Sequence, residues 1–157
     1  VEAVARPISG LTISGTAAVV DAKLTEDQAN STILITGSTG LRGDKFPNVA
    51  KFSGSAAVEY TWPLKGDLNG LIRADYAYVG ESASQFRPTY VYYEKPGDYG
   101  YANVRVGVEG ADWGAYAFVN NVADEVGLMS VTSAVNNAKQ VVSISPRTAG
   151  IQVRKRF

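Results

Sequence analysis

Alternation of apolar and polar side chains is the feature that most constrains the fold of this chain. Between residues 52 and 62 the even positions, from Phe52 to Trp62, are apolar or glycine, while the odd positions hold serine, alanine, glutamate and threonine. The same period of two recurs in 71–78 and 102–109, and helical spacing hardly occurs. Successive side chains of a strand point to opposite faces of its sheet. The sequence therefore predicts β-strands with one apolar side.

Seven strands follow from this pattern and its weaker continuations. They are predicted near 1–6, 11–24, 51–62, 71–78, 102–109, 113–122 and 147–157. The alternation is weakest near 113–122, where we place Tyr116 and Phe118 on the apolar side. A further strand within 135–146 remains an alternative that would raise the number to eight.

The connections between the strands alternate strictly between short and long. The short ones are 7–10, 63–70 and 110–113, and the long ones are about 25–50, 84–100 and 122–146. In an antiparallel meander every tight turn then lies at one end and every long loop at the other, as in outer-membrane barrels. We therefore predict an all-β fold, an antiparallel up-and-down transmembrane β-barrel segment of about seven strands. A soluble β-sandwich is the alternative, but strands of about 9 to 11 residues suit a tilted bilayer crossing better.

Aromatic side chains fall near both ends of the predicted strands. Those nearest the tight turns are Trp62, Trp113 and Phe157, and those nearest the long loops are Phe52, Tyr78, Tyr99 and Tyr101. Aromatic rings gather at the two interfaces of a membrane because they combine an apolar body with polar edges. The sequence therefore predicts two interface aromatic girdles.

Missing residue types narrow the chemistry. The chain contains no cysteine and no histidine, which excludes disulfides, Cys/His zinc sites, thiol nucleophiles and imidazole acid–base catalysis. Its 15 basic side chains balance 15 acidic ones, so no net positive charge is present to hold nucleic acid. We expect no enzyme activity, no cofactor, no metal site and no nucleic-acid partner.

Charged side chains occupy the opposite side of the strands. Those predicted to face a barrel lumen or a plug are Glu59, Arg73, Asp75, Arg105, Glu109, Arg154 and Arg156. Arg73 is expected to pair with Asp75. Likewise, Arg105 is expected to pair with Glu109. These residues either contact a plug or a ligand, or they form a solvated and mutually paired lining; both interpretations stay open.

One long loop and its flank concentrate tyrosines. The segment "RPTYVYYEKPGDYGY" offers a possible ligand loop made of Arg87, Tyr90, Tyr92, Tyr93 and Lys95. Tyrosine provides stacking area and a hydroxyl group, which suits capture of a sugar or a catecholate. Alternatively, these tyrosines only extend the hairpin above the membrane.

Several segments, taken in order, resemble a known family. They are "LRGDKFPNVAKFSGS", a "FVNN" followed by an acidic loop, and the terminal "PRTAGIQVRKRF", within a similarity that runs through nearly the whole chain. Together they resemble the C-terminal part of TonB-dependent outer-membrane receptors. The resemblance implies a barrel of about 22 strands, filled by an N-terminal plug domain, in the bacterial cell outer membrane.

The resemblance also implies a function and partners. Such receptors take up bulky, scarce nutrients, such as an iron–siderophore complex, cobalamin or an oligosaccharide, with energy coupled through TonB. Residues 1–157 would supply the C-terminal part of the barrel, and the plug domain and TonB box would lie in the rest of the parent chain. Expected partners are outer-membrane lipid, that plug domain, TonB through the missing N-terminal part, the barrel-assembly machinery and a small-molecule nutrient ligand.

The last strand carries the expected closure and assembly signal. Its lipid-facing residues would be Ile151, Val153 and Phe157, and its free edge would pair with the first strand of the barrel. Lys155 departs from the family pattern, in which an aromatic or apolar residue is common at that position. The alternative function is a small stand-alone outer-membrane barrel with a structural or adhesive role, which would need an even number of strands.

Overall fold

The computed structural model describes residues 1–28, 39–133 and 139–156, and all the regular secondary structure in these ranges is β-strand. The strands are β1 (Glu2–Ala5), β2 (Leu11–Val19), β3 (Phe52–Pro63), β4 (Asn69–Ser82), β5 (Gly97–Glu109), β6 (Trp113–Asn120), β7 (Leu128–Ser133), β8 (Lys139–Ser143) and β9 (Thr148–Lys155). Within these described ranges, no helix is long and apolar enough to cross a membrane.

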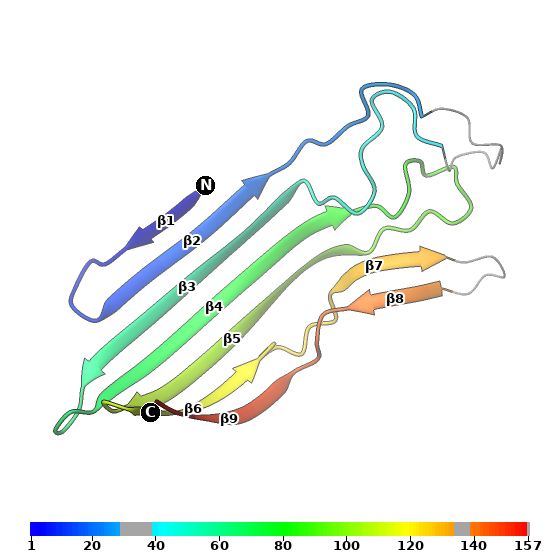
Figure 1. Cartoon of the computed structure of the whole chain (residues 1–157). Coiled ribbons are helices and arrows are strands. Elements are labelled where there is room, and N and C mark those ends of the chain that lie inside the picture. Colours follow the sequence, from blue (N-terminus) through cyan, green and yellow to red (C-terminus); the bar gives the residue numbers. More distant parts are fainter. Residues whose placement is uncertain (29–38, 134–138, 157) are drawn as a thin grey trace.

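Seven of the strands form one antiparallel sheet (Figure 1). Their order is β1-β2-β3-β4-β5-β6-β9, so each strand pairs with the strand of this sheet that comes next along the chain. This confirms the all-β class, the antiparallel meander and the expected number of strands in the main sheet. β1 and β9 form its two edges.

Turns and loops separate to opposite ends of this sheet. Figure 1 shows the tight turns β1–β2, β3–β4 and β5–β6 at the lower left, and we call this the turn end. The long connections β2–β3, β4–β5 and β6–β9 lie at the opposite end, which we call the loop end. The alternation predicted from the sequence is therefore confirmed.

The alternative eighth strand exists, but not in the main sheet. β8 lies within 135–146 and pairs with β7 alone. The two strands form a hairpin at the loop end, where Lys139 Nζ lies 2.5 Å from Glu94 Oε1 in the β4–β5 loop. The hairpin extends a loop and adds no strand to the main sheet.

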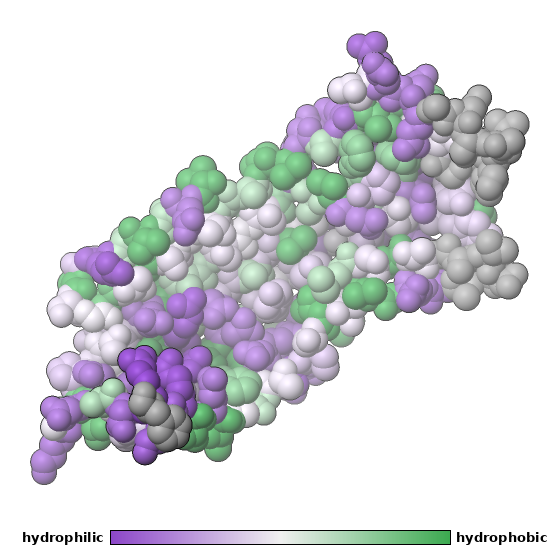
Figure 2. Space-filling model, viewed as in Figure 1, coloured by the Kyte–Doolittle hydropathy of each residue, from purple (hydrophilic) through white to green (hydrophobic). Residues whose placement is uncertain are grey.

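The cross-strand register separates two faces of the sheet. Residues directly opposite each other in an antiparallel pair project from the same face. One row across six strands reads Leu11, Tyr60, Ile72, Val106, Ala117 and Ile151, and we call its side the apolar face. The next row reads Thr12, Glu59, Arg73, Arg105, Phe118 and Gly150, and we call its side the polar face. Figure 2 shows hydrophilic side chains gathered over the turn-end half of β4 and β5.

On the central strand β4 the apolar face is the more exposed of the two. On β4, the apolar-face residues Ile72 and Tyr76 are 44% and 49% exposed, while the polar-face residues Arg73 and Asp75 are partly buried. Among the described residues no large side chain is fully buried, and no strand packs across either face. The sheet is a single layer without an enclosed core, whereas soluble proteins bury their large apolar side chains.

The register corrects the assignment of two side chains of β6. Phe118 lies opposite Arg105, and Tyr116 is the next residue but one, so both aromatic rings are on the polar face. Their predicted placement on the apolar side is wrong. The apolar face of β6 is made instead by small and branched residues, including Ala117 and Val119, and their modest hydrophobicity explains why the alternation is weak in the sequence.

Two members of the predicted loop-end girdle also lie on the other face. Tyr78 is opposite Gly100 on the apolar face, but Tyr99 and Tyr101 alternate with Gly100 and project from the polar face. Their assignment to one girdle with Tyr78 is therefore wrong. A girdle consists of rings that point toward lipid from one face of the sheet. Adjacent residues of a strand point to opposite faces, so Tyr99 and Tyr101 do not share the face of Gly100 and Tyr78.

Candidate functional site

A chain of polar contacts crosses the polar face. Arg73 lies opposite Glu59, and its Nη1 atom is 3.3 Å from Glu59 Oε2. Arg73 Nε is 3.6 Å from Asp75 Oδ1, which confirms that predicted pair. Asn103 Nδ2 donates to Asp75 Oδ2 at 2.6 Å and extends the chain to β5. Such partly exposed ion pairs contribute little to stability, about 0 to 1 kcal/mol each, so their main effect is to fix the orientation of the charges.

A second cluster surrounds Tyr116, which is only 4% exposed. Its hydroxyl donates a hydrogen bond to Glu109 Oε1, and the Arg105 guanidinium carbon lies 3.8 Å from the centre of its ring. Arg105 Nη2 donates to Gln152 Oε1 at 2.9 Å, and Arg154 Nη2 is 3.7 Å from Glu109 Oε1. The predicted Arg105–Glu109 pair is therefore wrong, because the tyrosine lies between them and Glu109 pairs with Arg154.

The two clusters border a shallow hollow of about 530 Å³. Its polar lining comes from β4, β5, β6 and β9 and includes Arg73, Asp75, Asn103, Arg105 and Gln152. Arg105 Nε is buried and has no hydrogen-bond partner among the described residues. No group of three or more carboxylates that could hold a metal ion occurs in the described part of the chain. The hollow therefore presents charged and hydrogen-bonding groups on the polar face.

Removal of the Tyr116 hydroxyl should destabilise the sheet by about 1 kcal/mol, because Glu109 would lose a hydrogen-bond donor. We expect this effect for Tyr116→Phe in equilibrium unfolding with denaturant. Tyr101→Phe is the matched control, since its hydroxyl has no hydrogen-bond partner in the described ranges and it lies on the same face. Equal stability of the two variants would contradict the role of this hydrogen bond.

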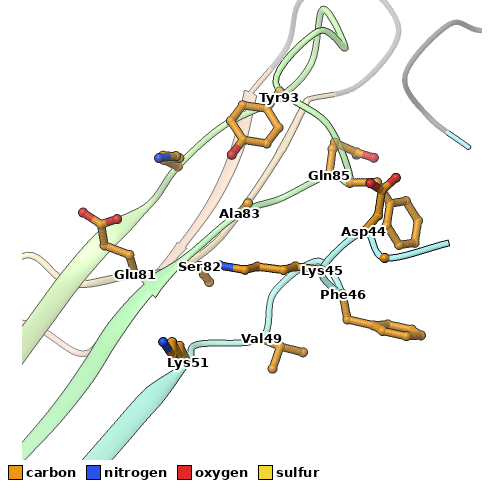
Figure 3. Close-up of a pocket in the computed structure, with 13 residues that line it drawn as sticks. Asp44, Lys45, Phe46, Val49, Lys51, Glu81, Ser82, Ala83, Gln85 and Tyr93 are labelled. Carbon is orange, nitrogen blue, oxygen red and sulfur yellow. The ribbon is translucent and has the colours of Figure 1, made fainter. Parts of the chain in front are cut away.

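Two loops at the loop end form a second candidate region. Arg87 Nε in the β4–β5 loop donates to Asp44 Oδ2 in the β2–β3 loop at 3.0 Å. The main-chain N–H of Asn48 donates to Ala83 O at 2.7 Å, which is a second link between the loops. The loops enclose a pocket of about 380 Å³ (Figure 3), which also touches the end of β4.

The predicted ligand loop contributes only part of this pocket. Tyr93 and Lys95 line it. Arg87 is instead engaged by Asp44, and Tyr90 packs edge-on against Tyr92 with their ring centres 5.4 Å apart.

Sequence reasoning missed the other side of the pocket. Lys45 and Lys51 line it from the β2–β3 loop, far from Lys95 in the sequence. No signal in the sequence joins them, because the Asp44–Arg87 contact that brings the loops together spans 43 positions.

The Asp44–Arg87 contact should survive mild acid. The pKa of Asp44 lies below its ordinary value of 3.8, chiefly because the N–H of Leu41 donates to its carboxylate; burial opposes this effect, and Arg87 lowers the pKa further. Because the folded pKa is below the unfolded one, the stabilisation is complete above pH 3.8 and is lost as the pH falls through the lowered value. An NMR titration of the Arg87 Nε–H signal should show this, and a midpoint above 3.8 would contradict it.

Asn121 is a further residue that the sequence did not single out. Its side chain donates from Nδ2 to Glu125 O at 2.9 Å and to Ser145 O at 3.0 Å, and its Oδ1 accepts from the Glu125 N–H at 2.9 Å. Asn121 is 3% exposed and has a φ of 51°, a left-handed conformation that asparagine tolerates. It joins the beginning and the end of the long β6–β9 connection.

The remaining predicted residues lie at the ends and edge of the sheet. Ile151 and Val153 project from the apolar face of β9 and are 81% and 73% exposed. Trp62 and Trp113 are on the apolar face at the turn end. Phe52 and Tyr78 are on the same face at the loop end, with ring centres 6.0 Å apart. Arg154 lies on the polar face, Arg156 follows β9, and Phe157 is outside the described residues.

Comparison of the chain with protein-family models, with characterised proteins and with solved structures finds no match. The similarity to TonB-dependent receptors therefore rests on the sequence segments quoted above.

Proposed function

We propose that this chain forms part of the barrel wall of a TonB-dependent outer-membrane receptor. The apolar face of the sheet contacts lipid, and the polar face lines an interior occupied by water and a plug domain. The receptor takes up a bulky, scarce nutrient, such as an iron–siderophore complex, an oligosaccharide or cobalamin, with energy from TonB. This chain itself has a supporting and binding role and carries out no chemical reaction.

The observation that carries this proposal is the uncovered apolar face. Rows of apolar side chains cross six strands, and among the described residues no strand packs over them. In water such a surface would be unfavourable by about 25 cal/mol for each Å² of apolar area. In a bilayer the same surface needs no protein partner. The opposite face of the central strands carries Glu59, Arg73, Asp75, Arg105 and Glu109, where water or a plug can solvate them. Asp98, which accepts a hydrogen bond from Tyr78, lies at the loop end of β5.

The edges and lengths of the strands support a larger closed barrel. β3, β4 and β5 contain 12, 14 and 13 residues, enough to cross a bilayer and extend beyond it at the loop end. The edge strands β1 and β9 have no partner on their outer sides within the described sheet. Exposed strand edges are not tolerated in hydrocarbon, because each unpaired backbone group costs several kcal/mol. In the proposed receptor, further strands of the barrel pair with these edges.

Lipid contact can be tested by site-directed spin labelling, since the chain has no native cysteine. A nitroxide at Ala74→Cys, on the apolar face, should be accessible to dissolved oxygen in lipid vesicles and protected from a water-soluble nickel complex. A nitroxide at Ala77→Cys, on the polar face of the same strand, should show the reverse preference. Equal access of the nickel complex to both sites would contradict the proposal that the apolar face contacts lipid.

TonB coupling needs a separate test in cells. Bacteria that lack this protein should lose growth on one nutrient from a panel of iron–siderophore complexes, cobalamin and oligosaccharides. Bacteria that lack TonB should lose growth on the same nutrient. Growth that requires this protein but not TonB would contradict the receptor and favour passive passage through a stand-alone barrel.

A further inference from the structure

The pocket at the loop end is built by contacts between segments that are distant in the sequence. The Asp44–Arg87 ion pair closes one side, and the rings of Phe46 and Phe86 meet edge-on with centres 6.2 Å apart. Gly40 lies against the Phe86 ring, where a side chain would clash. These contacts hold the two loops together, so the pocket is present before any ligand binds.

The charges of the pocket are unbalanced. Lys45, Lys51 and Lys95 line it, and none has a carboxylate within ion-pairing distance in the described part of the chain. Two carboxylates also line it, but Asp44 is neutralised by Arg87, which leaves Glu81 against three ammonium groups. The pocket therefore carries an excess of two positive charges.

The positive charge also acts on the beginning of the β2–β3 loop. Asp21 is close enough to Lys45 and Lys51 to sense their charge, and it forms an ion pair with Lys23 at 2.8 Å. That hydrogen bond is the main cause that lowers the pKa of Asp21, and the charges of Lys45 and Lys51 lower it further. Lys23 and Lys45 also occupy opposite positions of a backbone bridge, so like charges are held together. A cleft lined by one sign of charge attracts ligands of the other sign.

Figure 3 shows how the polar groups are directed into the pocket. The Lys45 side chain extends across it with its ammonium group toward Ser82, and Lys51 lies below. The Tyr93 ring stands on the opposite side with its hydroxyl group turned inward. The ring and the methylene stems of the lysines offer apolar contact beside the charges.

We propose that this pocket binds a small organic anion with two or more negative charges on a compact or planar apolar frame. The inference rests on the proposed function and narrows it, since it gives the nutrient, or the part of it that is recognised first, an anionic character. A volume of about 380 Å³ is enough for a molecule with one ring and several acidic groups. Uncharged oligosaccharides would leave the three ammonium groups without partners.

The test uses the full-length protein, purified in detergent. Trimesate, a benzene ring with three carboxylates, is the probe, and its uncharged triamide has the same shape without the charge. Calorimetry should detect trimesate binding that weakens as salt increases, and no binding of the triamide. The double variant Lys45→Glu and Lys95→Glu should weaken trimesate binding by at least about tenfold.

Two controls separate charge from folding. The conservative double variant Lys45→Arg and Lys95→Arg should retain binding within about threefold, because the positive charges remain. Lys65→Glu, in the β3–β4 turn at the opposite end, should leave binding unchanged. Trimesate affinity that is unaffected by the glutamate pair, or equal affinity for the triamide, would overturn the anion site.

The two proposals fail in different ways. Spin labels on the two faces with the same access to oxygen and to the nickel complex would contradict the proposal that the sheet is part of a barrel wall in the membrane. Opposite access on the two faces would support the barrel wall. If trimesate binding were then absent, or independent of the lysines, only the proposal of an anionic ligand would be contradicted.

Discussion

Replacement of Ala56 by arginine should lower the free energy of unfolding in lipid vesicles by about 2 to 4 kcal/mol. Ala56 lies opposite Gly15 and Tyr76 on the apolar face, in the middle part of β3. In the proposed orientation an arginine there would place its charge among lipid chains, away from water. Ala56 is exposed in the isolated sheet, so the same substitution in a soluble protein would be nearly neutral. The size of the effect therefore measures lipid contact rather than packing.

The adjacent residue supplies a matched control. Ala57 has the same side chain and almost the same position along β3, but it lies opposite Asp75 on the polar face. Ala57→Arg should change the free energy of unfolding by less than about 1 kcal/mol, because the new charge meets water and a carboxylate. Denaturant titrations followed by tryptophan fluorescence in vesicles would give both values. Equal destabilisation by the two substitutions would contradict the assignment of the faces to lipid and interior.

The main sheet could be predicted from the sequence because its information is local. In β3, β4 and β5 each residue type follows the face of the strand, so the period of two is visible without any knowledge of neighbours. The alternation of short and long connections then fixes the meander. The same reasoning predicted the Arg73–Asp75 pair, since residues two apart on one strand share a face.

Prediction failed where the choice of face depends on a partner strand. The sequence of β6 contains both small apolar residues and large aromatic ones, and aromatic rings alone suggest the apolar side. Tyr116 points to the polar face because Glu109 accepts its hydroxyl and Arg105 covers its ring. Gly107 opposite Tyr116 leaves the space for that ring, since a side chain there would clash with it. These contacts join two strands, β5 and β6, and cannot be recognised in either segment alone.

The loop-end pocket lay beyond prediction for a similar reason. The tyrosine-rich segment was recognisable by composition, and it contributes Tyr93 and Lys95. Lys45 and Lys51 become part of the same pocket only through contacts between two loops. Loop conformation is set by individual hydrogen bonds rather than by periodicity, so composition identified a region but not its chemistry.

Replacement of Asn121 by alanine should destabilise the β6–β9 connection by about 3 kcal/mol. Three hydrogen bonds between its side chain and the main chain of Glu125 and Ser145 would be lost, and the groups they satisfy lie around a residue that is 3% exposed. Alanine is also less favourable than asparagine at a φ of 51°, which adds about 1 kcal/mol. Hydrogen exchange of the Glu125 amide should accelerate strongly, because its acceptor is Asn121 Oδ1.

Two further variants separate the backbone from the hydrogen bonds. Asn121→Gly relieves the left-handed conformation but restores no hydrogen bond, so it should recover only about 1 kcal/mol relative to Asn121→Ala. Asn120→Ala, at the adjacent and exposed end of β6, should leave the exchange of Glu125 unchanged. If the glycine variant matched the natural protein, backbone strain alone would explain the effect of alanine. If the Glu125 amide stayed protected in both Asn121 variants, this side chain would not be what joins the two ends of the connection.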